Sequence, residues 1–182
     1  MLYCIHKVLI NSRSYLRKRV KMTTQPLQRV DHSALKANQL TIILLNILAF
    51  VFNLPLLAAL VAVVMGLGSL LRLPGFILLY RHVYKPLGLL KPDVLDDNPQ
   101  PHRFAQFLGF IFMTAGSVAL FLGGGVLGWG LVWLVVALAA LNAFGGFCVG
   151  CAVYYWLGIL NVPGFTIAPP VGIFPGMKPK VR

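Results

Sequence analysis

The sequence predicts an all-α integral membrane protein with four transmembrane helices, arranged as two hairpins with an interfacial helix in the loop between them. Of its 182 residues, 58% are hydrophobic and 11% are charged, against about 25% charged in ordinary soluble domains. Two long runs, 37–71 and 104–177, contain no Asp, Glu, Lys or Arg. Because a charged group is costly inside a bilayer, such runs are typical of membrane spans.

The run 37–71 is too long for a single straight span. As one helix it would extend about 52 Å, whereas a hydrocarbon core is about 30 Å thick. Asn53-Leu54-Pro55 lies at its centre, and proline is favoured in the first turn of a helix but disruptive in its interior. We therefore expect two short helices, about 38–53 and 55–71, in a tight hairpin. One strongly tilted, kinked helix is the alternative.

The segment 72–103 is the only long polar connection. Residues 73–85 mix apolar, aromatic and basic side chains, which is typical of a helix lying at a membrane interface. A turn-rich stretch follows and holds three of the four acidic residues, Asp93, Asp96 and Asp97. Three carboxylates could ligate a hard cation, but the expected structure is a solvated turn.

The second apolar run predicts a second hairpin. Spans at about 103–122 and 130–147 flank a glycine-rich turn, and the apolar stretch 148–160 is expected to continue the last helix with a bend. The final segment, 161–182, is rich in proline and is expected to be an irregular tail. The membrane domain therefore covers 37–160.

The N-terminal segment 1–36 is basic. Its first 21 residues carry six Lys or Arg and no acid, and a second methionine, Met22, follows. The favoured interpretation is that residues 1–21 are an over-called start, and a transit-like presequence is the alternative. Cys4 lies in this part and supports no site.

The charges predict an orientation. All sixteen Lys and Arg flank the apolar runs, so the positive-inside rule places both termini and segment 72–103 in the cytoplasm, for a multi-pass protein of the bacterial inner membrane. The net charge of +12 then indicates attraction to anionic lipid headgroups and not to nucleic acid. If the first run were a single span, the later segments would move to the opposite side.

The candidate catalytic residues are Cys148 and Cys151, at the end of the fourth predicted span. Three positions apart on a helix they share a face, so they could form a disulfide or bind a soft metal ion. The chain has no second cysteine pair, and His82 and His102 are the plausible additional ligands, so we expect no metal and no cofactor. The nearest charged residue downstream is Lys178. A helix break at Gly145-Gly146 would place the thiols at a helix N-terminus and lower their pKa.

Packing is the alternative role for the same residues. Cysteine is small and apolar, and it joins small residues that recur at helical spacing and let membrane helices approach closely. These residues are Ala139, Ala143, Gly146 and Gly150. Asn46 and Asn142 lie within spans and are expected to hydrogen-bond between helices. No acid or base lies in a predicted span, which disfavours a proton-coupled pump.

Three segments, 30–39, 101–109 and 146–154, resemble a bacterial membrane family catalogued as domain of unknown function 4395, whose signature is Gly-Phe-Cys-x-Gly-Cys. The resemblance covers about residues 30–160. It implies a small polytopic membrane protein. Some relatives occur near sulfurtransferase or thioredoxin-like proteins, which favours thiol chemistry and a partner of that kind.

Two functions stay open. In the first, Cys148 and Cys151 exchange electrons or a sulfane sulfur with a cytoplasmic partner. In the second, the chain is a structural or assembly subunit of a membrane complex without catalytic activity, in a homo- or hetero-oligomer. A small-solute channel formed by oligomers is a third, weaker hypothesis.

Overall fold

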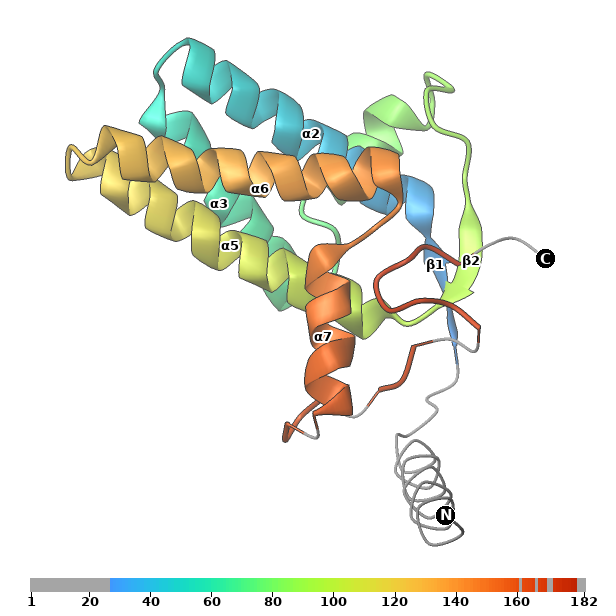
Figure 1. Ribbon diagram of the computed structural model, residues 1–182. Helices are drawn as coiled ribbons and strands as arrows, with labels where there is room; N and C mark the ends of the chain where they lie inside the picture. Colours follow the sequence, from blue (N-terminus) through green and yellow to red (C-terminus); the bar gives the residue numbers. More distant parts are fainter. Residues whose placement is uncertain (1–26, 161, 166, 170–171, 180–182) are drawn as a thin grey trace, which may run out of the picture.

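The computed structural model describes residues 27–160, 162–165, 167–169 and 172–179 and is mostly helical (Figure 1). Four long helices, α2 (His32–Val51), α3 (Pro55–Leu71), α5 (Pro99–Phe121) and α6 (Gly125–Gly145), form its centre. Each packs on two of the others, in the order α2, α3, α5, α6 and back to α2, so the four helices form a closed ring. The predictions about residues 1–21, Met22 and Cys4 lie outside the described residues.

Both hairpins turn where the sequence places a helix breaker. Between α2 and α3, Asn53 takes a positive φ of 48°, and Pro55 opens α3. Between α5 and α6, Gly123 takes a φ of 85°, which a residue without a side chain adopts freely. The first apolar run therefore forms two antiparallel helices and not one kinked helix.

Three helices, α2, α5 and α6, are long and apolar enough to cross a membrane, and α3 is shorter, at 17 residues. Large apolar side chains cover the outside of the bundle: Leu56 is 74% exposed, Leu70 80% and Val126 94%. An apolar exterior around an apolar interior is typical of helices surrounded by lipid.

A two-stranded antiparallel ribbon corrects the all-α prediction. It pairs β1 (Gln28–Asp31) with β2 (Val94–Asp97), and Gln28 lies opposite Asp97. Strands of four residues have too little alternation to give a periodic signal. The ribbon fastens the start of α2 to the segment before α5, and Asp31 caps α2 by accepting a hydrogen bond from the Ser33 backbone N–H at 3.0 Å.

The loop between the hairpins carries a short helical stretch, α4 (Ile77–Leu79), which continues as a π-helical turn, η1 (Tyr80–Tyr84). Tyr80 is buried against Ala34 and Ala37 of α2. Its hydroxyl donates a hydrogen bond to Asp31 Oδ2 at 2.8 Å. This stretch is thereby fixed against the first helix of the bundle.

The prediction that 148–160 continues the last long helix is wrong. Helix α6 ends at Gly145, Gly146 takes a left-handed φ of 64°, and a separate helix, α7 (Val149–Ile159), then begins. Figure 1 shows α7 turned away from the axis of α6 and packed beside the start of α5. Tyr154 connects α7 to α5, because its hydroxyl donates a hydrogen bond to Gln100 Oε1 at 2.9 Å.

Gly150 allows α7 to approach α5 this closely. A Cβ atom at position 150 would lie 2.6 Å from Ala105 Cβ and 2.8 Å from Ala105 Cα. Those atoms belong to or adjoin the α5 backbone and cannot rotate away. The close approach of the two helices therefore requires glycine here.

We expect Gly150→Ala to destabilise the protein, because crowding of this kind costs about 1–3 kcal/mol. The matched control is Gly130→Ala, where an added Cβ meets nothing within 4 Å and alanine improves helix propensity by about 1 kcal/mol. Thermal unfolding of the detergent-solubilised protein measures both. Equal unfolding temperatures for the two variants would contradict the packing of α7 on α5.

Candidate functional site

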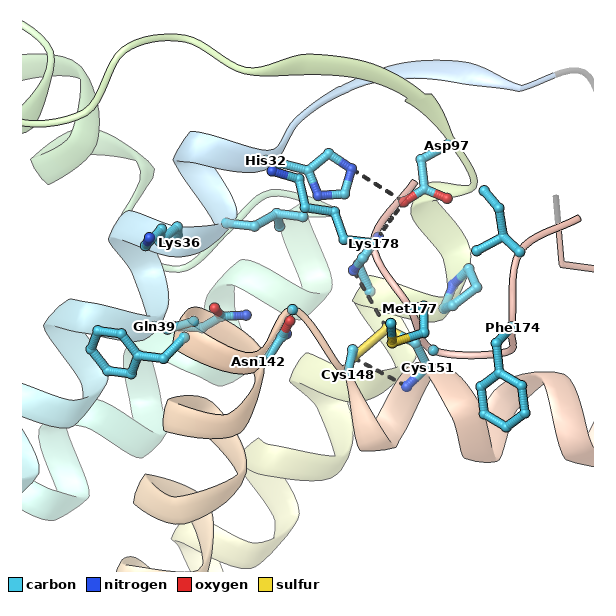
Figure 2. A pocket seen from close by; sticks show the side chains of 18 of the residues that line it. His32, Lys36, Gln39, Asp97, Asn142, Cys148, Cys151, Phe174, Met177 and Lys178 are labelled. Carbon is cyan, nitrogen blue, oxygen red and sulfur yellow. Dashed lines mark hydrogen bonds and ion pairs between the residues drawn. A yellow bond between two sulfur atoms is a disulfide. The ribbon is translucent and has the colours of Figure 1, made fainter. Parts of the chain in front are cut away.

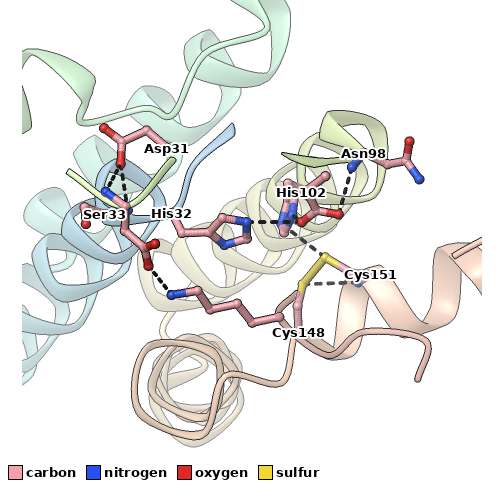
Figure 3. A network of polar contacts seen from close by, with 10 residues as sticks. Asp31, His32, Ser33, Asn98, His102, Cys148 and Cys151 are labelled. Atoms are coloured by element: carbon pink, nitrogen blue, oxygen red, sulfur yellow. Dashed lines mark hydrogen bonds and ion pairs between the residues drawn. A yellow bond between two sulfur atoms is a disulfide. The ribbon is translucent and has the colours of Figure 1, made fainter. Parts of the chain in front are cut away.

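The two predicted cysteines lie at the end of the bundle where α2 and α5 begin and α6 ends. Cys148 is the N-cap residue of α7 and Cys151 lies in its first turn. A disulfide joins them, with their Cα atoms 5.2 Å apart (Figure 3). Both are buried, at 5% and 3% exposure.

Cys148 has the more favourable position for a thiolate. Its sulfur accepts a hydrogen bond from the Cys151 backbone N–H at 3.2 Å, and it faces the positive end of the α7 dipole. A helix N-terminus stabilises negative charge, so this position favours the thiolate form of Cys148 once the disulfide is reduced. The helix break at Gly146 creates this position.

His102 supplies the base that the local sequence lacks. It comes from α5, 49 residues before Cys151, and its Nδ1 lies 3.4 Å from Cys151 Sγ. Its Nε2 lies 2.9 Å from Asp97 Oδ2. An ionised carboxylate can only accept, so in the neutral imidazole Nε2 carries the proton and Nδ1 presents a lone pair to the sulfur. The arrangement is a Cys–His–Asp relay suited to moving a proton.

Asp97 is buried at 5% exposure, and the prediction of a solvated turn is wrong for this residue. Burial opposes its charge, but the contacts with His102 and His32 and a hydrogen bond from the Asn98 backbone N–H at 2.7 Å outweigh burial and lower the pKa of Asp97 well below its ordinary value. Asp97 therefore stays ionised. Asp96, by contrast, is exposed, and Asp93 pairs with Lys178.

His32 is the residue that the sequence analysis missed. It opens α2, is 8% exposed, and places Nε2 3.2 Å from Asp97 Oδ2. This contact suits an ion pair but is poorly aligned for a hydrogen bond, and Nε2 has no hydrogen-bond partner among the described residues. Its ring meets that of His102 edge to face, 5.6 Å between centroids. The sequence did contain a signal for His32. His32 and His102 each lie near the start of an apolar run, on the predicted cytoplasmic side, where the cysteines were also expected.

Of the two histidines considered as metal ligands, His102 lies at the pair and His82 does not. His82 contacts Leu78 O of its own helical stretch and is exposed. His102, Cys148 and Cys151 offer three donor atoms within 4.8 Å of one another, and so do His32, Asp97 and His102. Two thiolates and an imidazole suit a soft ion such as Zn²⁺, but only after the disulfide is reduced.

The C-terminal segment 172–179 covers the cysteine pair. The Cys148 backbone N–H donates to Gly176 O at 2.8 Å, and the Lys178 backbone N–H donates to Gly146 O at 3.0 Å. The Lys178 ammonium pairs with Asp93. A cavity of about 240 Å³ lies between this segment, both cysteines and the ends of α2 and α6 (Figure 2). The irregular tail is thus part of the wall of the site.

Among the residues that the structure describes, neither asparagine forms the predicted hydrogen bond between helices. The Asn46 side-chain amide donates to Ile42 O of its own helix at 2.9 Å, and its Oδ1 is buried without a partner among the described residues. Asn142 lines the cavity beside Cys148. The small-residue stripe is interrupted as well, since Gly146 lies beyond the end of α6 and Gly150 belongs to α7.

Comparison with known proteins identifies the family. The model of a family described as "Domain of unknown function (DUF4395)" matches residues 30–158, so the chain belongs to this family. The matched range contains His32, Asp97, His102 and both cysteines of the pair. No curated protein and no solved structure matches the chain.

We expect Gly176→Ala to expose the cysteine pair. A Cβ there would lie 2.7 Å from Cys148 O and 2.9 Å from Ala152 Cβ, on a backbone with a φ of 89°. The crowding costs about 1–3 kcal/mol, which favours release of segment 172–179 and makes alkylation of the reduced thiols about tenfold faster. The measurement is the rate of maleimide labelling in a Cys4→Ser background.

Gly172→Ala is the matched control for this variant. Its φ is 79°, so its backbone is strained in the same way, but an added Cβ meets nothing within 4 Å. If both variants label at the same rate, segment 172–179 does not shield the pair.

The lowered pKa of Asp97 predicts that the folded protein loses stability in acid. Because folding lowers its pKa, its contribution is complete above the ordinary carboxyl value of about 3.9 and is lost as pH falls below it. We expect Asp97→Asn to unfold at lower temperature than the wild type at pH 7, and to lose less stability between about pH 5 and pH 3. The exposed Asp96→Asn is the control, and identical acid sensitivity of wild type and Asp97→Asn would contradict the assignment.

Proposed function

We propose that this member of the DUF4395 family is a four-span membrane protein with a dithiol–disulfide redox centre at Cys148 and Cys151. The observation that carries the proposal is the placement of the pair at the start of α7, with the His102–Asp97 relay 3.4 Å from Cys151 Sγ. A cysteine that served packing alone would need no base or carboxylate beside it.

The geometry supports a different proposed role for each of the two sulfurs. In the reduced protein, the Cys148 thiolate attacks one sulfur of a partner disulfide, and the partner's other sulfur leaves as a thiolate. His102 takes the proton from Cys151, whose thiolate then attacks Cys148 Sγ, closes the intrachain disulfide and releases the second partner thiolate. The partner gains the two electrons that the pair loses. Run backwards, the same steps reduce the pair.

The four-span topology is supported by the packing and by the charges. Helix α3, with 17 residues, would extend about 25 Å, which a thin bilayer can accommodate. The described Lys and Arg belong to segments at the end of the bundle that holds the site, whereas the turns 52–54 and 122–124 carry no charge. By the positive-inside rule, we place this end and both termini on the cytoplasmic side of a bacterial inner membrane.

A cytoplasmic location favours a redox role for the disulfide over a structural one. Thiols there are kept reduced, and the disulfides that do form are usually transient and catalytic. The chain already has a closed ring of packed helices, and a disulfide spanning three residues encloses too short a loop to add much stability.

The proposed partner is a thioredoxin-like or sulfurtransferase protein. Lys36 lines the cavity and is exposed, so it suits an acidic surface or an anionic thiol. Because the cysteines are 5% and 3% exposed, a protein partner reaches them only when segment 172–179 moves aside.

The test uses sealed membrane vesicles of known orientation, with Cys4 replaced by serine. We expect the wild-type pair to cycle between dithiol and disulfide when glutathione or its disulfide is supplied from the cytoplasmic side. Cys148→Ser and Cys151→Ser each abolish the intrachain disulfide. His102→Gln slows its closure about a hundredfold, as loss of a general base does, so that a mixed disulfide with glutathione accumulates.

His82→Gln is the matched control, because His82 lies away from the pair. The redox proposal fails if His102→Gln behaves like His82→Gln, or if the thiols resist both oxidation and labelling. It also fails if both serine variants keep the wild-type function in the host, which is the result expected of an assembly subunit.

A further inference from the structure

We propose that a cavity beneath the cysteine pair binds a membrane quinone, which accepts the two electrons of the reduced thiols. The inference rests on the dithiol–disulfide function proposed above and names the oxidant that regenerates the disulfide. It is carried by a second cavity inside the bundle, which reaches Cys148 from the membrane side.

The second cavity has a volume of about 140 Å³ and lies among α2, α5, α6 and α7. It shares a wall with the cavity below segment 172–179, since five residues line both, namely Leu35, Gln39, His102, Asn142 and Cys148. Its deeper part is apolar, with Ile42, Phe112 and Val135. Because α2, α5 and α6, the helices long enough to cross a membrane, supply this apolar lining, the deeper part of the cavity suits a ligand that dissolves in lipid.

The polar wall of the cavity has two side-chain amides available to a ligand. Asn38 and Gln106 also line it, but each is occupied: Asn38 Oδ1 accepts from the Phe76 backbone N–H at 2.9 Å, and Gln106 Nε2 donates to Met65 O at 3.1 Å. Within the described part of the chain, the side chains of Gln39 and Asn142 have no hydrogen-bond partner. Figure 2, which draws the first cavity, shows Asn142 beside Cys148 and Gln39 beyond Asn142.

Two free amides beside a disulfide fit the head group of a quinone. A carboxamide N–H donates to a quinone carbonyl, and the carboxamide oxygen accepts from the hydroxyl formed on reduction, so the same residues bind both redox forms. No Lys or Arg among the described residues lines this cavity, which disfavours a phosphorylated electron carrier.

The proposed reaction conserves bonds, electrons and protons. The two S–H bonds of Cys148 and Cys151 break and one S–S bond forms. The two electrons and two protons released convert both quinone carbonyls to hydroxyls, which gives one quinol. Cys148 lines the quinone cavity, whereas Cys151 Sγ lies 3.4 Å from His102 Nδ1, so His102 is placed to take the proton of Cys151.

The experiment mixes the pre-reduced protein, in the Cys4→Ser background, with decylubiquinone, whose ring has no open position for a thiol to add to. We expect one quinone to be reduced per protein as the disulfide forms. The loss of the ultraviolet absorbance of the quinone measures this reaction. Gln39→Leu and Asn142→Leu each slow the reaction at low quinone concentration about tenfold, the factor expected for one lost hydrogen bond. Because Gln39 and Asn142 also line the first cavity, both variants are assayed for exchange with glutathione disulfide as well, and a quinone site predicts a larger loss in quinone reduction than in that exchange.

Gln28→Leu is the control, since Gln28 is an exposed amide on β1 that lines neither cavity. If the wild type exchanges with glutathione disulfide but does not reduce the quinone, the quinone proposal is overturned and the redox function stands. If the wild type does neither, both proposals fail. If Gln39→Leu and Asn142→Leu reduce the quinone as fast as Gln28→Leu, the cavity is not its binding site.

Discussion

The buried carboxylate of Asp97 is the interaction on which the end of the bundle depends. One oxygen lies 3.2 Å from His32 at the start of α2 and 2.9 Å from His102 in the first turns of α5. Asp97 itself ends β2, which pairs with β1 immediately before α2. A single buried charge therefore joins the strand ribbon to one helix of each hairpin. Two opposing imidazoles make this burial tolerable, because an unpaired carboxylate at 5% exposure would be very costly.

The cysteine pair uses this network without belonging to the ring of long helices. Gly146 ends α6 in a left-handed conformation, and α7 then lies against α5, where Gly150 allows close contact. This placement brings Cys151 to His102 and leaves Cys148 at the helix N-terminus, facing two cavities. The polar relay at Cys151 and the apolar cavity at Cys148 thus meet at one disulfide, which is the arrangement expected of the proposed centre that exchanges electrons between an aqueous partner and a lipid-soluble one.

Local patterns in the sequence predicted the hairpins, because Pro55 and the glycines near 123 act within a few residues and charge-free runs reveal apolar helices directly. The cysteine pair could also be predicted, because its spacing is a local pattern in the sequence. The relay could not, since His102 and Asp97 meet Cys151 only through packing between segments about fifty residues apart. The turn of α7 depends on the φ of Gly146, and the cover over the pair depends on two hydrogen bonds, from the Cys148 N–H to Gly176 O and from the Lys178 N–H to Gly146 O. Neither leaves a periodic signal.

The two turns at the far end of the bundle bear on how the protein enters a membrane. In the proposed topology, residues 52–54 and 122–124 are the parts that must cross the hydrophobic core, and they carry no charge. Moving a few neutral residues through lipid costs far less than moving a charged loop. In that topology each hairpin can insert as a unit while its basic flanks stay behind. The histidines, Asp97 and the cysteines then belong to the end of the bundle that does not have to cross the membrane.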